Sequence, residues 1–376
     1  ATAVALAQRG WQLRVHERAN ELRTAGAGIY VYEYGCQVFE ALDIYDDATA
    51  NAFRGRVREL RNEKNEVVSR IEWPDDGPMR MYSIVRQDII DALARVAQRD
   101  GVQIETNSEV TSAAADGTLQ LAGGKTVKAD LIIGADGVNS SVRDALGLIK
   151  HSIRLKESCI RALIPRTSEE QSGLEGQKYY EYLGGKRRVL YTPCSDNDLY
   201  LALCMPRSDE NGKRVPVDVD SWSRAFPHLE SVFQRMDNAG RLDDFGEIKL
   251  TRWSSGNVAV LGDAANAMPP NIGQGAGTAM MNGLSLAVYL DKHADVPGAL
   301  QAWERNERPL TEHTQRVSRF YAIPTQWPFW IRHPTMQAVH AVPWLNKQRI
   351  RTASHIPLGT RPEDRPSVQS EISATK

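Results

Sequence analysis

The sequence lacks several features that would assign a protein quickly to a class. It has almost no net charge, because 46 Lys and Arg residues balance 47 Asp and Glu residues, so no nucleic-acid or anionic membrane surface is indicated. No run approaches the roughly 18 consecutive apolar residues of a membrane span. The four cysteines form no CxxC pair and no metal-ligand spacing: Cys36, Cys159, Cys194 and Cys204. This usage predicts buried thiols, a cytoplasmic protein and no metal site.

The sequence also has no initiator Met and no signal-like segment. Its first residues have the pattern of part of a supersecondary unit. Residues 3–7 are typical of a helix end, Gly10 of a helix C-cap, and residues 11–16 alternate like a strand that Glu17 closes. A helix, a turn, a strand and an acidic residue form the second half of a dinucleotide-binding βαβ unit. Such a unit also needs a first strand and a glycine-rich diphosphate turn, and the family resemblance described below implies that both lie upstream of Ala1.

A chain of 376 residues suits about two domains. Helices are expected at 35–42, 86–99, 221–236, 276–293 and 297–322, a hairpin at 55–72 and mostly strands at 151–250. This pattern predicts a mixed α/β fold in which a Rossmann-like domain (1–54, 83–150 and 251–300) is interleaved with a β-sheet-rich substrate domain (55–82 and 151–250). A C-terminal helical region at 301–354 and a polar tail at 355–376 would follow.

The most informative stretch is the strand VAVLG followed by DAANAMPPNIGQGAG. Asp263 ends a buried strand, where a carboxylate is costly without a partner. Gly273, Gly275 and Gly277 allow the backbone to approach a ligand just before a helix N-terminus, which offers free N–H groups to an anion. An ordinary strand–loop–helix with turn glycines would look similar, so this local pattern leaves both interpretations open.

Three further motifs, in a fixed order, favour the ligand site. The chain resembles the flavin-dependent aromatic monooxygenases, the p-hydroxybenzoate-hydroxylase-like family, whose GDAAHxxxPxxGQG pattern is matched from Gly262 to Gly275 with Asn266 in place of His. The family's DGxxSxxR motif begins at Asp136, Arg86 matches its flavin-contacting arginine, and a GAGI stretch lies at 26–29. Order and spacing agree from residue 1 to about residue 320, so the Rossmann-like domain is expected to bind FAD.

The resemblance implies an FAD-dependent monooxygenase that uses NADH or NADPH. It would hydroxylate a hydroxylated aromatic or pyridine carboxylate through a flavin C4a-hydroperoxide, with or without ring opening. The expected partners are the small aromatic substrate, O₂ and NAD(P)H, with no nucleic acid and no membrane, and the chain would be a monomer or a homodimer. Two alternatives stay open: a flavoprotein reductase or oxidase of the same fold that does not hydroxylate, and a non-catalytic flavin-binding protein.

The resemblance also implies which residues contact the cofactor. Glu17 would accept hydrogen bonds from the adenosine ribose, Asp263 would bind the ribityl chain, and Arg86 would reach the pyrophosphate. The first-turn amides after Gln274 would face the flavin edge that gains negative charge on reduction. The Asp136 motif would either position the pyridine nucleotide or brace the two domains. The expected cofactor-binding residues are Glu17, Arg18, Arg86, Val110, Asp136, Asp263, Gly273, Gln274, Gly275, Ala276 and Gly277.

The middle of the chain supplies the candidate substrate residues. The RxLYxPCxxNxLYL pattern from Arg188 to Leu201 is similar to that of the family's 2-methyl-3-hydroxypyridine-5-carboxylate oxygenases and 6-hydroxynicotinate monooxygenases. Arg187 and Arg188 must point to opposite faces of a strand, so only one can face the flavin. The family's substrate-contacting Arg and Tyr fall on Arg188 and Tyr200, and Tyr30 falls where the 6-hydroxynicotinate enzymes carry a histidine. A surface arginine and a core tyrosine are the structural alternatives.

The expected catalytic residues are therefore Tyr200 and Tyr30. The expected substrate-binding residues are Arg188, Tyr200, Arg58, Tyr82 and Pro270. Tyr191 is a further amphipathic side chain suited to covering a polar ring.

Overall fold

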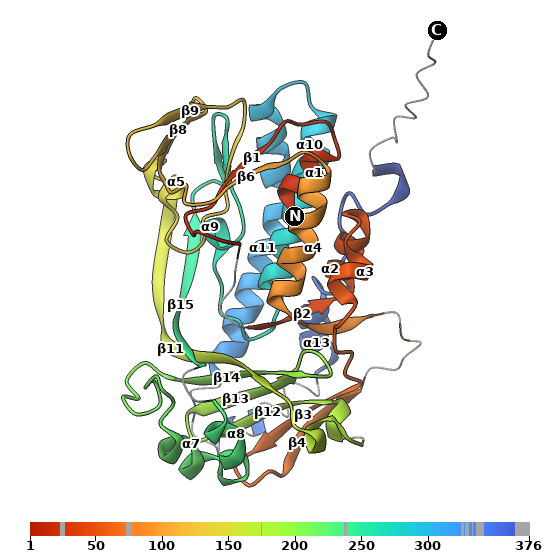
Figure 1. The fold of residues 1–376 in the computed structure, drawn as a ribbon, viewed down its shortest axis with the longest axis vertical. Coiled ribbons are helices and arrows are strands. Elements are labelled where there is room, and N and C mark those ends of the chain that lie inside the picture. The colour runs from red at the N-terminus through yellow and green to blue at the C-terminus, as the bar shows by residue number, and fades with distance from the viewer. Residues whose placement is uncertain are drawn as a thin grey trace.

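The structure is a computed structural model, and it describes residues 1–22, 27–72, 77, 79–173, 175–236, 239–324, 327, 331–332, 334–335 and 342–364. Figure 1 shows two stacked parts: a half built of helices and short strands, which contains the N-terminus, and a half built around one broad sheet. We call them the helical half and the sheet half. The fold is the mixed α/β arrangement that the sequence predicts.

Parallel strand pairs form the centre of the helical half. Strand β1 (Arg14–His16) pairs in parallel with β6 (Gln103–Glu105), and β10 (Ile132–Gly134) pairs in parallel with β17 (Val258–Val260), whose other edge carries β16 (Ser254–Ser255). A separate antiparallel sheet contains β7 (Val110–Ala114), β8 (Thr118–Leu121) and β9 (Thr126–Lys128). Parallel strands place their carboxyl ends at one edge, which is where ligands bind in such sheets.

Helices cover these strands and bury one large core. They are α1 (Thr2–Ala7), α2 (Glu33–Ala41), α3 (Tyr45–Thr49), α4 (Arg86–Arg99), α5 (Ser141–Ala145), α9 (Asp263–Asn266), α10 (Gly275–Lys292) and α11 (Val296–Ala322). Helix α4 begins and ends where the sequence predicts, and it buries Ile89, Ala92 and Val96 on one face, which is the period of an amphipathic helix. Gly283 of α10 lets α1 approach closely, because an added Cβ would lie 2.1 Å from the Thr2 hydroxyl.

The sheet half contains seven strands in the order β15–β11–β14–β13–β12–β3–β4. All neighbours are antiparallel except β12 and β3. The strands are β3 (Val57–Asn62), β4 (Val67–Glu72), β11 (Ile149–Pro165), β12 (Lys178–Gly184), β13 (Arg187–Pro193), β14 (Asp198–Pro206) and β15 (Arg241–Leu250). The hairpin predicted at 55–72 is confirmed as β3 and β4, with Asn65 at a positive φ of 64° in its turn.

The two faces of this sheet have different neighbours. Alternate residues of β14, namely Leu199, Leu201 and Leu203, pack into a core with Trp222 and Phe226. The helix predicted at 221–236 is in fact two short helices, α7 (Val219–Ala225) and α8 (Glu230–Gln234), because Pro227 lacks an N–H and disfavours helical geometry at the residue before it. A further short helix on this half is α6 (Ser168–Gln171).

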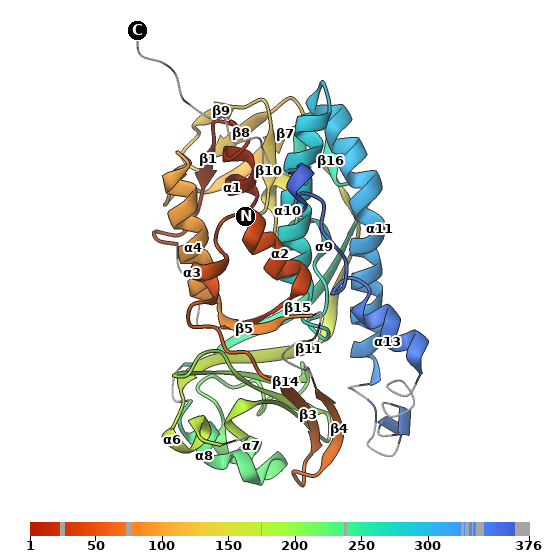
Figure 2. The same cartoon turned by 90° about the vertical axis from the view of Figure 1, so that its right-hand side faces the viewer.

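The opposite face of the sheet meets the helical half. Tyr200, Ala202 and Cys204 of β14 cluster there with Ala27 and with residues of β11 and β15. The antiparallel ribbon of β2 (Gly28–Tyr32) and β5 (Met81–Val85) lies between the two halves, as Figure 2 shows. Gly28 allows this crossing, because an added Cβ would lie 2.3 Å from the Cys194 sulfur. We call this side of the sheet the inner face.

The C-terminal elements run along the side of both halves. Helix α13 (Pro343–Ile350) lies beside the lower end of α11 in Figure 2. The Arg332 guanidinium donates to the Gly185 carbonyl at 2.6 Å, in the turn between β12 and β13. Among the described helices, none has the length and apolar character needed to cross a membrane.

Candidate active site

The site begins at the carboxyl ends of β10 and β17. The Leu261 amide donates to the Gly134 carbonyl at 3.0 Å, so the two strands end side by side. The chain then turns at Gly262, whose φ of 64° and ψ of −143° favour glycine. This turn places Asp263 at the strand edge, where the sequence predicts a ligand contact.

Asp263 lies near two arginines. The side chains of Asp263 and Arg86 are both exposed. Partial desolvation raises the pKa of Asp263 against the charges of Arg86 and Arg161, and partial desolvation together with the charge of Arg161 lowers the pKa of Arg86. Within the described residues, neither the Asp263 carboxylate nor the Arg86 guanidinium has a hydrogen bond or ion pair at contact distance. Both groups are therefore available to a polar ligand.

A loop between α9 and α10 forms the next wall. Helix α10 begins at Gly275 with Gln274 as N-cap and no side-chain cap, so its first-turn amides are available to an anion. An added Cβ at Gly275 would meet nothing closer than the Met268 side chain at 3.9 Å, so space is open above the helix end. We call residues 267–274 the α9–α10 loop.

Three tyrosines from β2 and α2 hold this loop. The Tyr32 hydroxyl donates to the Ile272 carbonyl at 3.2 Å, and the Tyr34 hydroxyl donates to the Gln274 carbonyl at 2.9 Å. An added Cβ at Gly273 would lie 3.3 Å from the Tyr30 ring, and one at Gly277 would lie 2.4 Å from the Tyr34 hydroxyl. The absence of a side chain at Gly277 is therefore explained by Tyr34, independently of any ligand.

The predicted adenosine contacts lie at the edge of the β1–β6 pair. Glu17 directly follows β1, and its Oε1 accepts from the Ala19 amide at 2.8 Å. Arg18 is exposed. Val110 begins β7, pairs with Leu121, and packs partly buried against the core. The structure therefore gives Glu17 a local capping bond and Val110 a packing role, and their cofactor roles stay predictions.

The Asp136 motif makes local contacts in this structure. The Val142 amide donates to Asp136 Oδ2 at 3.2 Å, and Ser140 caps α5 by accepting from the Arg143 amide at 2.9 Å. The buried Arg143 guanidinium donates to the Val138 carbonyl at 3.0 Å and to the Ala264 carbonyl at 3.2 Å. These bonds fasten the loop after β10 to the loop after β17, both in the predicted Rossmann-like domain, so the two roles proposed for this motif stay predictions.

Arg188 lies on the inner face of the sheet and is already paired. Its guanidinium lies 3.3 Å from Glu181, 3.8 Å from Glu157 and 3.5 Å from the Cys204 sulfur. Glu181 is also bonded to Arg58, on the neighbouring strand β3. Arg187 points to the other face, where it pairs with Asp209 and lies over the Trp222 ring. The alternation predicted for the two arginines is confirmed, but Arg188 is not a free cation.

Tyr30 and Tyr200 occupy the boundary between the two halves. The Tyr30 hydroxyl lies 2.6 Å from Thr192 Oγ1, and its ring meets Tyr179 edge-on at 5.6 Å. Burial raises the pKa of Tyr30 and of Tyr200, so both remain protonated at neutral pH. Within the described chain no acceptor or donor is found for the Tyr200 hydroxyl, which leaves it available to a ligand.

Two tyrosines that the sequence places in the substrate pocket, Tyr82 and Tyr191, do not lie with Tyr30 and Tyr200. Tyr82 lies on the face of β5 opposite Ser83, and its hydroxyl is 3.1 Å from that of Tyr45 on α3. Tyr191 packs against Tyr180 on the outer face of the sheet. The positions of Tyr82 and Tyr191 differ from the expectation for the same reason. Alternation along a strand determines which residues share a face, but tertiary packing decides which face meets the site. Pro270 is exposed in the α9–α10 loop, and Gly26 of the predicted GAGI stretch lies outside the described residues.

A cavity lies between the α9–α10 loop and the inner face. The cavity has a volume of about 60 Å³, which is room for several waters. Four segments line it: the β3–β4 hairpin, strands β12 and β13, the α9–α10 loop, and the C-terminal elements. The lining residues are Arg58, Leu60, Ser69, Ile71, Glu181, Leu183, Arg188, Asn271, Ile272, Tyr321, Arg332 and Arg349.

The surroundings of Asp263 fit FAD. Its carboxylate can accept from a sugar-like hydroxyl, Arg86 supplies a cation for phosphate, and the α10 amides suit an electron-rich carbonyl edge. The family described as an FAD binding domain matches residues 1–318. The chain belongs to the FAD-binding monooxygenases. When bound, FAD supplies the redox chemistry of this p-hydroxybenzoate-hydroxylase-like family, with NAD(P)H as the usual reductant.

Three known proteins similar to this FAD-binding monooxygenase have a nitrogen-containing ring in their name or in their bound ligand. The chain is 37% identical over 339 residues to 2-heptyl-3-hydroxy-4(1H)-quinolone synthase of Mycobacteroides abscessus, covering 90% of each chain. A solved tetrameric form of 2-methyl-3-hydroxypyridine-5-carboxylic acid oxygenase is 35% identical, with a TM-score of 0.85 over 95% of this chain and 93% of that one. Klebsiella pneumoniae HpxO, solved with FAD and uric acid, shares the fold at 22% identity, with a TM-score of 0.77 over 97% of this chain and 94% of that one.

Sequence reasoning missed several polar residues of this monooxygenase. The charge of Arg161 opposes the rise that burial causes in the pKa of Asp263, and it adds to the burial that lowers the pKa of Arg86. Its sequence position, two residues after Cys159 in a predicted strand, places it on the same face of the strand as that cysteine. Glu181 interrupts a strand of aromatic residues, KYYEYLG, which is a place where a carboxylate needs a partner. Asn271 and Arg349 had no signal, because a loop and a distant helix come together at the cavity only in the folded chain.

Proposed function

We propose that this monooxygenase hydroxylates an aromatic ring that contains nitrogen and carries an oxygen substituent. The observation that carries the proposal is the cavity, one wall of which is the α9–α10 loop. That loop leads directly into the amides of α10, so a ring in the cavity would lie beside the flavin edge. A nitrogen-containing ring with an oxygen substituent is common to the names of the quinolone synthase and the hydroxypyridine oxygenase.

The residues around the cavity have complementary tasks in this proposal. Leu60, Ile71 and Leu183 provide apolar surface for a ring or an alkyl substituent, and they exclude water from the reacting atoms. Tyr30 and Tyr200 lie outside the cavity lining, at the boundary between the two halves, and their hydroxyls would orient polar groups of a ring that extends toward them. Both stay protonated at neutral pH, because burial disfavours their anions.

Two candidate substrates contain such a nitrogen ring and differ in the substituents that the ring carries. The first is a hydroxypyridine carboxylate, as the sequence predicts. The second is a 2-alkyl-4(1H)-quinolone, which the 37% identity to the quinolone synthase supports. The pairing of Arg188 with Glu181 and Glu157 removes the original argument for a carboxylate at Arg188, so the ring class is proposed ahead of either substituent.

The test is oxygen transfer by FAD-loaded protein. NADH and NADPH oxidation would be followed with 2-heptyl-4(1H)-quinolone, 2-methyl-3-hydroxypyridine-5-carboxylate and 4-hydroxybenzoate under ¹⁸O₂. We expect a product that contains ¹⁸O from one or both nitrogen rings and none from the benzoate. NAD(P)H oxidation without labelled product from any substrate would favour a reductase or an oxidase of the same fold.

A further inference from the structure

Four arginines line the cavity, and three of them are occupied by protein acceptors. Arg58 and Arg188 share Glu181, and Arg188 also has Glu157 within 3.8 Å. Arg332 donates to the Gly185 carbonyl. These contacts hold three guanidinium groups against the walls, and the carboxylates compensate the charges of Arg58 and Arg188.

Arg349 differs from Arg58 and Arg188 because no carboxylate contacts it among the described residues. The acceptor found for its guanidinium is the neutral amide oxygen of Asn346, at 3.1 and 3.4 Å. Arg332 also has a neutral acceptor, but that contact holds it against the turn between β12 and β13. The nearby charge of Arg58 adds to the burial that lowers the Arg349 pKa, so an anion that joins Arg349 would be favoured.

The backbone of Arg349 is also tied to the α9–α10 loop. Gln274, the N-cap residue of α10, donates from Nε2 to the Arg349 carbonyl at 3.0 Å. The neighbouring Gln348 carbonyl lies 3.0 Å from His313 Nε2 on α11. These two bonds fix the backbone at the C-terminal end of α13 relative to the α9–α10 loop and to α11, so the base of the Arg349 side chain is held beside the cavity.

We propose that Arg349 binds a negatively charged oxygen of the substrate, and that it has the specificity role that the sequence assigned to Arg188. The inference rests on the proposed function, because it places an aromatic substrate in the cavity. The oxygen is either a carboxylate on the ring or the ring oxygen in its anionic form. Both suit a guanidinium, which offers two parallel N–H donors to an anion.

The experiment compares ligands of one shape and different charge. The probes are 3-hydroxypyridine-5-carboxylate and its 5-carboxamide, and binding to FAD-loaded protein is read from the change in flavin absorbance without NAD(P)H. If Arg349 binds the carboxylate, the acid binds more tightly than the amide, and Arg349→Gln weakens the acid by about 10- to 100-fold while the amide is unchanged. If it binds the ring oxygen, acid and amide weaken alike, and the pKa of the bound ring hydroxyl rises in the variant.

Two variants serve as controls. Arg351→Gln removes an exposed arginine two residues away and should change neither constant. Arg349→Lys keeps the charge but loses the two-pronged geometry, so it should bind the affected probe with intermediate strength, and it replaces Arg349→Gln if that variant fails to fold.

The proposal is overturned if Arg349→Gln has the same two dissociation constants and the same bound hydroxyl pKa as the unmodified protein. If Arg349→Gln does not fold, the same comparison is made with Arg349→Lys. The proposal is equally overturned if the unmodified protein shows neither a preference for the acid nor a depressed hydroxyl pKa. Oxygen transfer is measured separately, so a monooxygenase whose substrate anchor lies elsewhere would be recognised as such.

Discussion

Glu181 is the residue whose replacement tests the electrostatics of the cavity wall most directly. It lies between Arg58 and Arg188, and its side chain is only 13% exposed. Removing one partner of a buried ion pair costs about 3–5 kcal/mol, because the remaining charge stays desolvated. Arg188 keeps Glu157 at 3.8 Å, and glutamine still accepts hydrogen bonds, so we expect Glu181→Gln to lose about 3 kcal/mol, the lower end of that range.

The assay is thermal unfolding of the FAD-saturated protein, with a double variant as the control. An unfolding entropy of about 2.1 cal/mol/K per residue gives about 0.8 kcal/mol/K for 376 residues. A loss of about 3 kcal/mol should therefore lower the Tm of the single variant by about 4 °C. Arg58→Met in the Glu181→Gln background should cost less than it does alone, because it removes a cation that has lost its partner. A Tm change of less than about 1 °C, together with additive effects, would refute the conclusion that this pairing stabilises the wall.

The pH dependence of the same variant has a definite sign. Burial alone would raise the pKa of Glu181, but the charges of Arg58 and Arg188 hold it below the ordinary value. A carboxylate with a depressed pKa contributes stability above its unfolded pKa, near 4.3, and loses it as the pH falls through the folded pKa. The Tm difference between the native protein and Glu181→Gln should therefore be full at pH 7 and shrink in acid.

Three further predictions concern other parts of the molecule. Asp263→Ala should weaken FAD binding by about 10- to 150-fold, the range for one or two charge-assisted hydrogen bonds, and full flavin absorbance in a purified, folded variant would contradict this role. Tyr200→Phe should leave FAD content and NAD(P)H oxidation intact but release more hydrogen peroxide per product, which a peroxide assay measures; unchanged coupling would place the orienting hydroxyl elsewhere. Glu307→Gln should raise stability above pH 7 by at most about 3 kcal/mol, because burial raises the pKa of Glu307 to about 7; the gain should vanish below about pH 4, where the native carboxyl is protonated in both states, and a gain that persists there would argue against titration.

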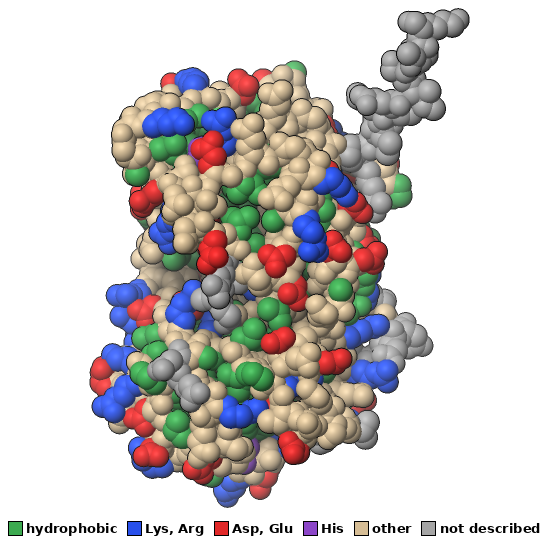
Figure 3. Space-filling view, viewed as in Figure 1, with side chains coloured by type: hydrophobic (Ala, Val, Ile, Leu, Met, Phe, Trp, Pro, Cys, Tyr) green, Lys and Arg blue, Asp and Glu red, His purple; other side chains and the backbone are tan. Residues whose placement is uncertain are grey.

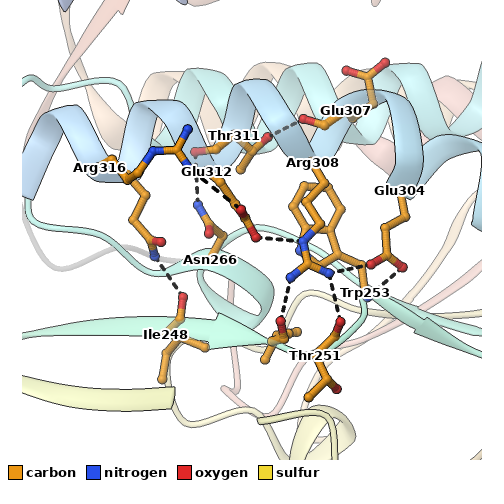
Figure 4. A network of polar contacts seen from close by, with 12 residues as sticks. Ile248, Thr251, Trp253, Asn266, Glu304, Glu307, Arg308, Thr311, Glu312 and Arg316 are labelled. Atoms are coloured by element: carbon orange, nitrogen blue, oxygen red, sulfur yellow. Dashed lines mark hydrogen bonds and ion pairs between the residues drawn. The ribbon is translucent and has the colours of Figure 1, made fainter. Parts of the chain in front are cut away.

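The last of these sites is shown in Figure 4, where the Glu307 carboxylate points away from a network centred on Arg308. Arg308 bonds Glu304 and Glu312 on its own helix and the carbonyls of Leu250 and Thr251 at the end of β15. Glu304 in turn accepts from the Trp253 amide at 2.8 Å. The network anchors α11 to the sheet, so the protonation of Glu307 can change stability without disturbing the network itself.

The surface follows the charge balance of the sequence. Figure 3 shows acidic and basic side chains interspersed over the face that it presents, with no broad field of one sign. Such a face provides no long-range attraction for a polyanion. The charges that matter for the proposed chemistry are the desolvated ones inside, and composition cannot reveal them, because it does not say which of 46 cations are buried.

Local sequence patterns predicted the elements better than the contacts between them. Helix α4 and the β3–β4 hairpin follow from periodicity and turn residues, which act over a few positions. The break between the two helices at 219–234 follows from Pro227, which disfavours helical geometry at the residue before it. Tyr82 and Tyr191 could not be placed from their strands, because the face that meets the active site is set by packing against other parts of the chain.

Arg188 shows most clearly where sequence reasoning stops. The motif identified the residue, and alternation showed that it and Arg187 would separate. Its partners are fixed by strand pairing: β13 brings Arg188 opposite Leu183 of β12 and opposite Cys204 of β14, and Glu181 and Glu157 become neighbours only through that register. Nothing in the sequence indicates that Arg188 has an acidic partner, but in the fold Glu181 and Glu157 neutralise its charge. The requirement for a cation near an anionic ring oxygen then passes to Arg349, more than 160 positions further along the chain, which no motif connects to the strand.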